Sequence, residues 1–284
     1  MPAASPNPPI VEMRGITISF PGVKALDGVD FVLRPGEVHT LMGENGAGKS
    51  TLIKALTGVY PIDDGTITVA GRAREFRGTA DAQAAGVSTV YQEVNLCTNL
   101  SVGENVMLGH EIRRAGVIDW KATHREAARH LENLGVRIDT RSILSKHSIA
   151  IQQLVAISRA MVTESTVLVL DEPTSSLDRV EVDQLFGVIR ELRDRGVAIL
   201  FVTHFLDQVY EISDRLTVLR NGALVGEYAA SELPRATLIS LMIGRELDEL
   251  DALSRTSARE IPRDSAPVFD AVGLGRRGVV EPAD

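Results

Sequence analysis

The chain has 284 residues, of which 44% are hydrophobic and 24% charged, and this composition is ordinary for a globular protein with a substantial core. Its 30 basic and 38 acidic residues give a net charge of −8, which argues against a nucleic-acid-binding protein, because such proteins usually carry a basic face. Cys97 is the only cysteine, so a disulfide within the chain is excluded. No apolar run approaches the length that spans a bilayer, so any membrane association is expected to go through a partner.

The N-terminal half begins with a proline-rich lead, residues 1–8, which is expected to be disordered. Short runs rich in β-branched residues or bounded by glycine and proline then predict strands at residues 10–19, 29–33, 37–42, 65–71 and 87–91. A helix is expected to start at Leu52. From residue 102 to about residue 161 the pattern becomes helical, so the segment at about 95–161 is interpreted as a helical insertion.

The C-terminal half returns to alternating strands and helices. Strands are predicted at residues 166–170, 197–202, 215–219 and 223–228, and helices at residues 180–195, 205–212 and 236–242. The first two of these strands are continuous apolar runs, which are typical of strands buried on both faces of a parallel sheet. The alternation predicts an α/β fold with a mainly parallel core sheet.

A phosphate-binding loop is predicted between the strand at 37–42 and the helix that starts at Leu52. The pattern G-x-x-x-x-G-K-[ST] occupies residues 43–50 of the stretch Gly43, Glu44, Asn45, Gly46, Ala47, Gly48, Lys49, Ser50 and Thr51. Glycines let backbone N–H groups point at an anion, and the helix N-terminus adds further donors. Lys49 would contact the β- and γ-phosphates and Ser50 would bind Mg²⁺. The alternative is a plain glycine turn with an exposed lysine.

Polar side chains follow three of the predicted strands. Asp171 and Glu172 close the apolar run at 167–170, where the carboxyl ends of strands face a ligand crevice. Asp171 is therefore predicted in the Mg²⁺ shell, and Glu172 is predicted to orient and deprotonate the attacking water. The alternative is that the two acids cap the turn that follows.

His204 and Gln92 also follow strands. A ring N–H of His204 would reach the γ-phosphate, and the amide of Gln92 would contact both Mg²⁺ and the nucleophilic water. The other five histidines, His39 among them, have no such context and are interpreted as surface or core residues.

Together these motifs resemble the ATP-binding cassette (ABC) family, and the resemblance covers nearly the whole chain. It implies a P-loop NTPase fold with a mainly parallel core sheet, an N-terminal antiparallel β subdomain and an inserted α-helical subdomain. Residues 43–50 match the Walker A loop of the family and residues 168–171 match its Walker B strand. The resemblance also implies that Glu172 is the catalytic glutamate and His204 the switch histidine, with Lys49 at the reacting phosphate.

Further site residues are implied by the same resemblance. Gln92 matches the Q-loop, which also contacts the transmembrane partner in this family. Asp178 lies in the segment 175–178, which matches the D-loop. Phe20 matches the aromatic residue that stacks on adenine; as an isolated residue it would more often belong to the core.

The chain departs from the family at the signature sequence, Leu-Ser-Gly-Gly-Gln. The corresponding stretch, residues 147–151, reads His-Ser-Ile-Ala-Ile, so Ser148 is kept and both glycines are replaced. A Cβ then stands where the backbone must approach a phosphate of the opposite cassette. The site that this stretch completes is predicted to be weak or inactive. The site that holds Lys49 would be completed by a second signature outside this chain.

The domain organisation suggests a tandem protein. Residues 9–247 are interpreted as the cassette, 248–266 as a linker and 267–284 as the start of a second cassette. The last segment begins with the same pattern of proline, apolar, acidic and glycine positions as residues 9–16. The chain is therefore expected to be a piece of a longer protein; the alternative is a coincidence between two edge strands.

The subgroup that the chain resembles is the ATPase subunit of bacterial monosaccharide importers of the ribose, xylose and galactose type. The resemblance to this subgroup is carried by the altered signature with residues 152–155 that follow it, by residues 220–222 and by residues 242–247. The expected function is Mg²⁺-dependent ATP binding and hydrolysis that powers sugar import through transmembrane permease subunits. The expected partners also include the second cassette and, indirectly, a periplasmic sugar-binding protein; no nucleic acid is expected. The expected location is the cytoplasmic face of the membrane, as a peripheral subunit.

Two alternatives remain open at this point. One is a soluble ABC-type ATPase that acts on nucleic acid or ribosomes. The other is an isolated nucleotide-binding half that does not turn over.

Overall fold

The structure is a computed structural model that describes residues 8–91, 95–244, 274–276 and 280–283. The chain divides into two compact units, residues 1–244 and residues 245–284. In the second unit β13 (Leu274–Arg276) pairs with β14 (Val280–Ala283) in an antiparallel arrangement. The predicted linker lies outside the described residues, and the repeat of the first domain stays a prediction.

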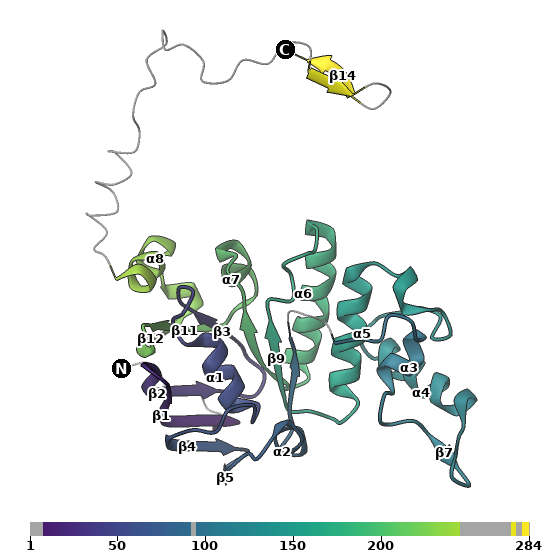
Figure 1. Cartoon of the computed structure of the whole chain (residues 1–284), viewed down its shortest axis with the longest axis horizontal. Coiled ribbons are helices and arrows are strands. Elements are labelled where there is room, and N and C mark those ends of the chain that lie inside the picture. The colour runs from purple at the N-terminus through teal and green to yellow at the C-terminus, as the bar shows by residue number, and fades with distance from the viewer. Residues whose placement is uncertain (1–7, 92–94, 245–273, 277–279, 284) are drawn as a thin grey trace. The chain divides into compact units, whose positions relative to one another are not determined.

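The first unit is built on a core sheet of six strands in the order β12-β11-β3-β10-β9-β6 (Figure 1). Its strands are β3 (Val38–Met42), β6 (Val87–Val90), β9 (Val167–Asp171), β10 (Ala198–Val202), β11 (Arg215–Arg220) and β12 (Ala223–Ala229). All neighbours pair in parallel except β11 and β12, which form an antiparallel hairpin. The predicted mainly parallel α/β fold is confirmed.

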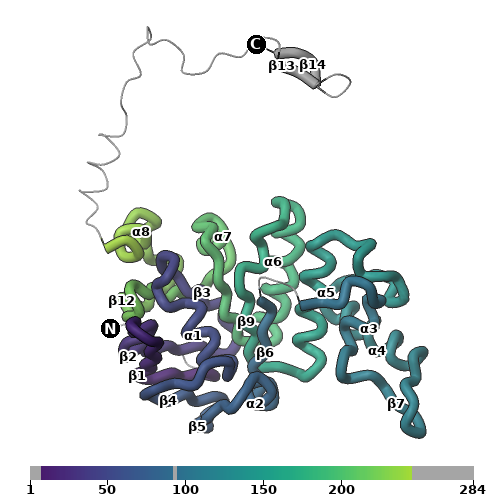
Figure 2. Tube along the Cα trace, in the orientation of Figure 1, coloured from purple at the N-terminus to yellow at the C-terminus, as the bar shows by residue number. Residues whose placement is uncertain are grey.

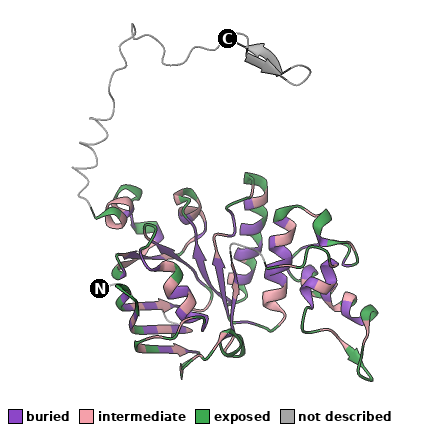
Figure 3. Cartoon of the chain, viewed as in Figure 1, coloured by how far each residue is buried: buried purple, intermediate pink, exposed green. Residues whose placement is uncertain are grey.

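Alternation along the central strands divides the interior into two main cores. Leu168 and Leu170 of β9 pack into the core that contains α5 (Ile149–Met161) and α6 (Arg179–Asp194). Their neighbours Val167 and Val169 pack on the opposite face, against α1 (Lys49–Leu56) and the antiparallel sheet. Successive side chains of a strand point to opposite faces, so a continuous apolar run is what a sheet covered on both sides requires (Figure 3).

The antiparallel sheet has the order β2-β1-β4-β5. Its strands are β1 (Val11–Phe20), β2 (Val23–Leu33), β4 (Asp64–Val69) and β5 (Arg72–Arg74). The prediction for the second strand was too short, because residues 23–28 contain polar residues and a glycine and become a strand only through pairing with β1. The edge strand β5 was not predicted, since its sequence, Arg-Ala-Arg, carries no apolar pattern.

The helical insertion consists of α3 (Val102–Val106), α4 (Trp120–Glu132) and α5, which lie at one end of the first unit, with α8 (Arg235–Ile243) at the other (Figure 2). It also contains a small hairpin of β7 (Arg113–Arg114) and β8 (Val117–Ile118), which the helical pattern did not predict. The remaining helices are α2 (Thr79–Ala84), α7 (Leu206–Ile212) and α8 (Arg235–Ile243). Within residues 8–91 and 95–244, no helix is both long and apolar enough to cross a membrane.

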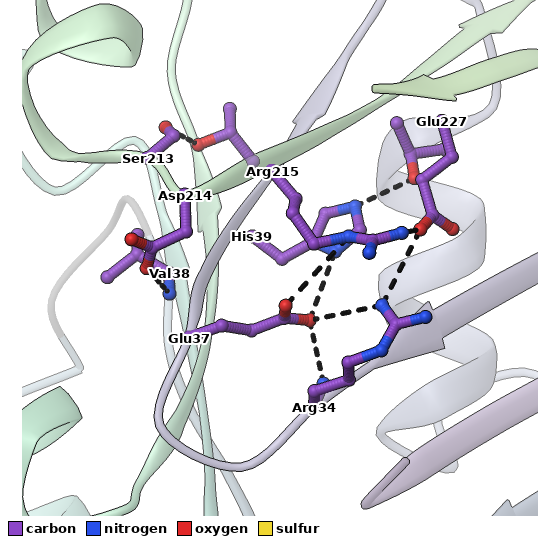
Figure 4. Close-up of polar contacts among 10 residues, drawn as sticks. Arg34, Glu37, Val38, His39, Ser213, Asp214, Arg215 and Glu227 are labelled. Carbon is purple, nitrogen blue, oxygen red and sulfur yellow. Dashed lines mark hydrogen bonds and ion pairs between the residues drawn. The ribbon is translucent and has the colours of Figure 1, made fainter. Parts of the chain in front are cut away.

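A partly buried charge cluster lies at the amino end of β3 and is formed by Arg34, Glu37, His39, Arg215 and Glu227 (Figure 4). His39 is fully buried; its Nε2 lies 2.8 Å from Thr217 Oγ1, and its Nδ1 lies 3.4 Å from Glu37 Oε1. Arg34 Nη1 lies 3.5 Å from Glu227 Oε1, and Arg215 forms an ion pair with the same carboxylate. The cluster therefore joins the end of β2 to β3, β11 and β12 with two acids and two guanidinium groups.

Candidate functional site

The predicted phosphate loop connects β3 to α1, and two of its glycines are required by close packing. A Cβ on Gly43 would lie 2.3 Å from the carbonyl oxygen of Leu219, and one on Gly48 would lie 2.8 Å from Leu26 Cδ2. Gly46 has a φ of +83°, and no atom lies within 4 Å of the place where its Cβ would be. The loop is thus packed against the protein on one side and open at Gly46, where an anion can approach its backbone.

Lys49 is half-buried at the start of α1. Its Nζ donates hydrogen bonds to the carbonyl oxygens of Gly43, at 2.8 Å, and Glu44, at 2.9 Å. Burial lowers the pKa of Lys49, and the charges of Glu172 and Asp171 oppose this effect. An anion bound in the loop would add a partner for the ammonium group and offset its loss of solvent.

The two predicted acids stand where β9 ends. Asp171 pairs with Val202 in the register of β9 and β10. Burial raises the pKa of Asp171, the charge of Glu172 adds to the effect, and Lys49 and Lys54 oppose it. Charged groups whose pKa values are displaced toward their neutral forms are common at binding sites, where a ligand restores the balance.

Glu172 has a left-handed backbone, with a φ of 49°, which is uncommon for a residue other than glycine. Its N–H donates to the carbonyl oxygen of Val202 at 2.9 Å, so this backbone is fixed by the neighbouring strand. His204 Nδ1 lies 3.3 Å from Glu172 Oε2. The ends of β9 and β10 therefore bring together two residues that the sequence predicted to act on one phosphate.

These groups line a common cavity of about 420 Å³. Its lining comes from the phosphate loop, the two acids, the start of β2, the end of β10 and the turn between β11 and β12. It consists of Val23, Lys24, Ala25, Asn45, Gly46, Ala47, Gly48, Lys49, Ser50, Thr51, Asp171, Glu172, Val202, Asn221 and Gly222. The structure thus brings together the predicted loop and both acids. His204 is connected to the cavity through Glu172.

The start of β2 and the turn between β11 and β12 were not predicted to lie at this cavity. The N–H of Gly222 donates to the carbonyl oxygen of Ala47 at 3.1 Å, and the N–H of Asp27 donates to the carbonyl oxygen of Gly222 at 2.8 Å. The pair Asn221-Gly222 predicts a hairpin turn, which is confirmed between β11 and β12. Nothing in the turn's own sequence shows that it packs against the phosphate loop.

Phe20 is the last residue of β1, and 40% of its surface is exposed. It is not among the residues that line the cavity, but its strand partner Val23 is. Phe20 therefore ends its strand next to the cavity. This position suits an aromatic surface for a base whose phosphates lie in the loop.

Ser148 and Asp178 lie elsewhere, at the N-termini of α5 and α6. Ser148 Oγ accepts a hydrogen bond from the N–H of Ile151 at 3.4 Å, and Asp178 Oδ1 accepts one from the N–H of Glu181 at 2.9 Å. Both residues are exposed, and neither lines the cavity. Gln92 lies outside the described residues, so its predicted role is not placed by the structure.

The described residues contain no group of three or more His, Cys, Asp and Glu side chains that would by itself hold a metal ion. Ser50 and Asp171, however, both line the cavity. A hydroxyl and a carboxylate are the oxygen ligands that Mg²⁺ takes when most of its shell comes from water and substrate phosphates. The donor set therefore fits an ion that arrives with a nucleotide rather than one held by the protein alone.

A phosphate loop at the carboxyl ends of a parallel sheet, with two acids at the end of a neighbouring strand, defines a P-loop nucleoside triphosphatase. The chain belongs to the ABC transporter family, whose family model matches residues 26–175. Among solved structures it is similar to the ADP conformation of MJ1267, an ATP-binding cassette of an ABC transporter, with a TM-score of 0.73 and 25% identity over 86% of this chain and 99% of that one. The predicted family and fold are thereby confirmed.

Curated relatives are more similar in sequence. The fructose import ATP-binding protein FruK of Bifidobacterium longum is 61% identical over 97% of this chain and 54% of its own length. The galactofuranose transporter ATP-binding protein YtfR of Escherichia coli is 51% identical over 97% of this chain and 54% of its own. The ribose import ATP-binding protein RbsA 1 of Rubrobacter xylanophilus is 48% identical over 96% of this chain and 53% of its own length. The chain spans about half the length of these relatives.

Proposed function

We propose that the chain is an ATP-binding cassette that hydrolyses ATP to power sugar import through a membrane permease. The observation that carries the proposal is the cavity in which Lys49, Asp171 and Glu172 meet around an open phosphate loop. The names of the relatives support the direction and the cargo class, because they are import proteins for fructose, galactofuranose and ribose.

In this proposal different residues of the chain have different roles in phosphoryl transfer. The loop at Gly46 and the ammonium group of Lys49 bind and orient the phosphates, and Phe20 stacks on the adenine. Glu172 orients the attacking water and takes its proton, while His204 holds the Glu172 carboxylate and contacts the γ-phosphate. A bound Mg²⁺ ion, held by Ser50 and Asp171 with the predicted Gln92, would neutralise charge on the phosphates.

The partners of the cassette are part of the same proposal. A second cassette would close over the phosphate loop, and Ser148 would face the nucleotide held by that second cassette. Transmembrane permease subunits would dock near Gln92 and the helical insertion, at the cytoplasmic face of the membrane. A periplasmic sugar-binding protein would act through the permease. Closure and reopening drive transport only if the permease contacts different surfaces in the two states.

Transport in proteoliposomes tests the proposal. The full-length protein, reconstituted with its permease, is supplied with ATP on the cassette side and with radiolabelled fructose, ribose or galactofuranose on the other. We expect ATP-dependent uptake of at least one sugar, lost in the Glu172→Gln variant. ATP hydrolysis that RNA or ribosomes stimulate, without any sugar uptake, would instead favour the nucleic-acid alternative.

A further inference from the structure

Tyr60 lies in the loop that follows α1, outside every motif that points to the site. Its ring centroid is 5.3 Å from that of Phe20, and the two ring planes are 71° apart. This edge-to-face geometry is one of the favourable arrangements of two aromatic rings. Phe20 ends a strand with 40% of its surface exposed, and an exposed side chain without such a neighbour changes rotamer within nanoseconds.

We propose that Tyr60 is a positioning residue for base recognition: it holds the ring of Phe20 in the orientation on which the adenine of ATP stacks. This inference rests on the proposed function, because Phe20 contacts a base only when a nucleotide occupies the cavity. Preorganising one ring removes an ordering cost from binding, so the effect belongs to the affinity for the base.

Tyr60 is itself held by the helix that carries the phosphate loop. Its backbone N–H donates to the carbonyl oxygen of Lys54, on α1, at 3.1 Å. Lys54 Nζ lies 5.0 Å from the centroid of the Tyr60 ring and 3.4 Å from its hydroxyl oxygen, which is the geometry of a cation–π contact. The turn between them is fixed at Gly58, where a Cβ would lie 2.6 Å from the carbonyl oxygen of Gly78.

The same loop is attached to the strand of Phe20. The N–H of Asp63 donates to the carbonyl oxygen of Thr17 at 2.9 Å, and Asp63 Oδ2 accepts from the N–H of Ser19 at 2.7 Å. Residues 58–63 thus connect α1, which begins at Lys49, to the residue directly before Phe20. This connection fixes the separation between the surface for the base and the loop for the phosphates.

The experiment compares two ligands that differ by the base and sugar. Dissociation constants for ATP and for inorganic tripolyphosphate, both with Mg²⁺, are measured by calorimetry on the 284-residue chain and its variants. We expect Tyr60→Leu to weaken ATP binding by roughly two- to tenfold, the range of one aromatic pair, and to leave tripolyphosphate binding unchanged. Tyr60→Phe keeps the ring and should bind ATP as the wild type does. Val59→Ala, at an exposed position in the same loop, is the matched control.

A Phe20→Ala background completes the test. If Tyr60 acts through Phe20, Tyr60→Leu has no further effect on ATP binding once Phe20 is removed. An equal loss in both backgrounds, or an equal loss for ATP and tripolyphosphate, would overturn the positioning role. So would a Phe20→Ala variant that binds ATP like the wild type. Failure of the proposed function would look different, because the wild-type chain would then bind neither ligand.

Discussion

The two ends of the core sheet differ in how their charges are paired. At the amino end of β3 the partly buried charge cluster pairs Glu37 and Glu227 with Arg34 and Arg215, so the charges have ion-pair partners within the chain. At the carboxyl end of the sheet, burial raises the pKa of Asp171 and lowers that of Lys49. Both of these groups are therefore displaced toward their neutral forms. Burial also lowers the pKa of Arg215 in the cluster, but there two carboxylates lie within ion-pair distance of the guanidinium group.

This difference separates a structural cluster from a binding site. Charges that are paired inside the chain connect strands. Charges that are buried without full compensation are stabilised when a ligand brings an opposite charge. Here phosphates would supply that charge to Lys49, and a divalent cation would supply it to Asp171. Removing a charge should accordingly affect folding at one end and nucleotide chemistry at the other.

The largest expected effect lies at the carboxyl end. Glu172→Gln keeps the shape of the side chain but removes the base, so ATP turnover in the reconstituted transporter should fall by about 10²- to 10⁴-fold, the usual contribution of a general base. ATP binding should be retained. Glu132→Gln, at an exposed position on α4, is the control. Normal turnover in Glu172→Gln would remove this residue from the catalytic role.

The second effect lies at the amino end. Glu37→Gln leaves Arg34 and Arg215 with Glu227 as the remaining acid of the cluster, and the free energy of unfolding should fall by about 1–3 kcal/mol. Urea denaturation measures the loss, and Glu232→Gln, at an exposed position, is the control. The affinity for ATP should stay the same. A variant that loses ATP binding without losing stability would show that the comparison of the two ends is wrong.

Asp171→Asn should have the opposite effect on stability. Because burial raises the pKa of Asp171 in the folded state, its ionised form at neutral pH opposes folding, and the neutral amide should raise the melting temperature of the nucleotide-free chain. The gain should be smaller than the loss at Glu37. The additional stabilisation by Mg²⁺ and ATP should largely disappear. A lower melting temperature in the nucleotide-free variant would count against an uncompensated carboxylate at this position.

The smallest expected effect is a pH dependence from His39. Burial, the main cause, lowers its pKa from 6.5; Arg215 and Arg34 act in the same direction, and Glu37 opposes them. The unfolded chain then binds the proton more readily, so stability falls as the pH is lowered below about 6.5, by at most about 1.4 kcal/mol per pH unit. The slope of unfolding free energy against pH should flatten in His39→Gln and not in His110→Asn, an exposed control. Equal slopes in all three proteins would exclude His39 as the cause.

Local patterns predicted most of the fold and the centre of the site. The apolar runs that form β9 and β10 must be buried on both faces of a sheet. The glycine loop at 43–51 requires a strand before it and a helix after it. Both requirements can be recognised in the sequence itself. The contacts of Asn221-Gly222 with Ala47 and of Tyr60 with Phe20 join distant segments. Such contacts depend on strand order and loop path, which local composition does not contain. The hairpin β7–β8 was missed because four residues are too few for a pattern.

The central claim is that the charges at the carboxyl end of the core sheet bind the phosphates of ATP. Nucleotide binding by the Lys49→Ala variant tests this claim most directly. Calorimetry on the 284-residue chain, with Lys121→Ala as an exposed control, gives dissociation constants for ATP with Mg²⁺. Loss of one charged hydrogen-bonding group should weaken binding by about 10- to 100-fold, while the control binds like the wild type. Equal affinity in Lys49→Ala and the wild type would contradict the account.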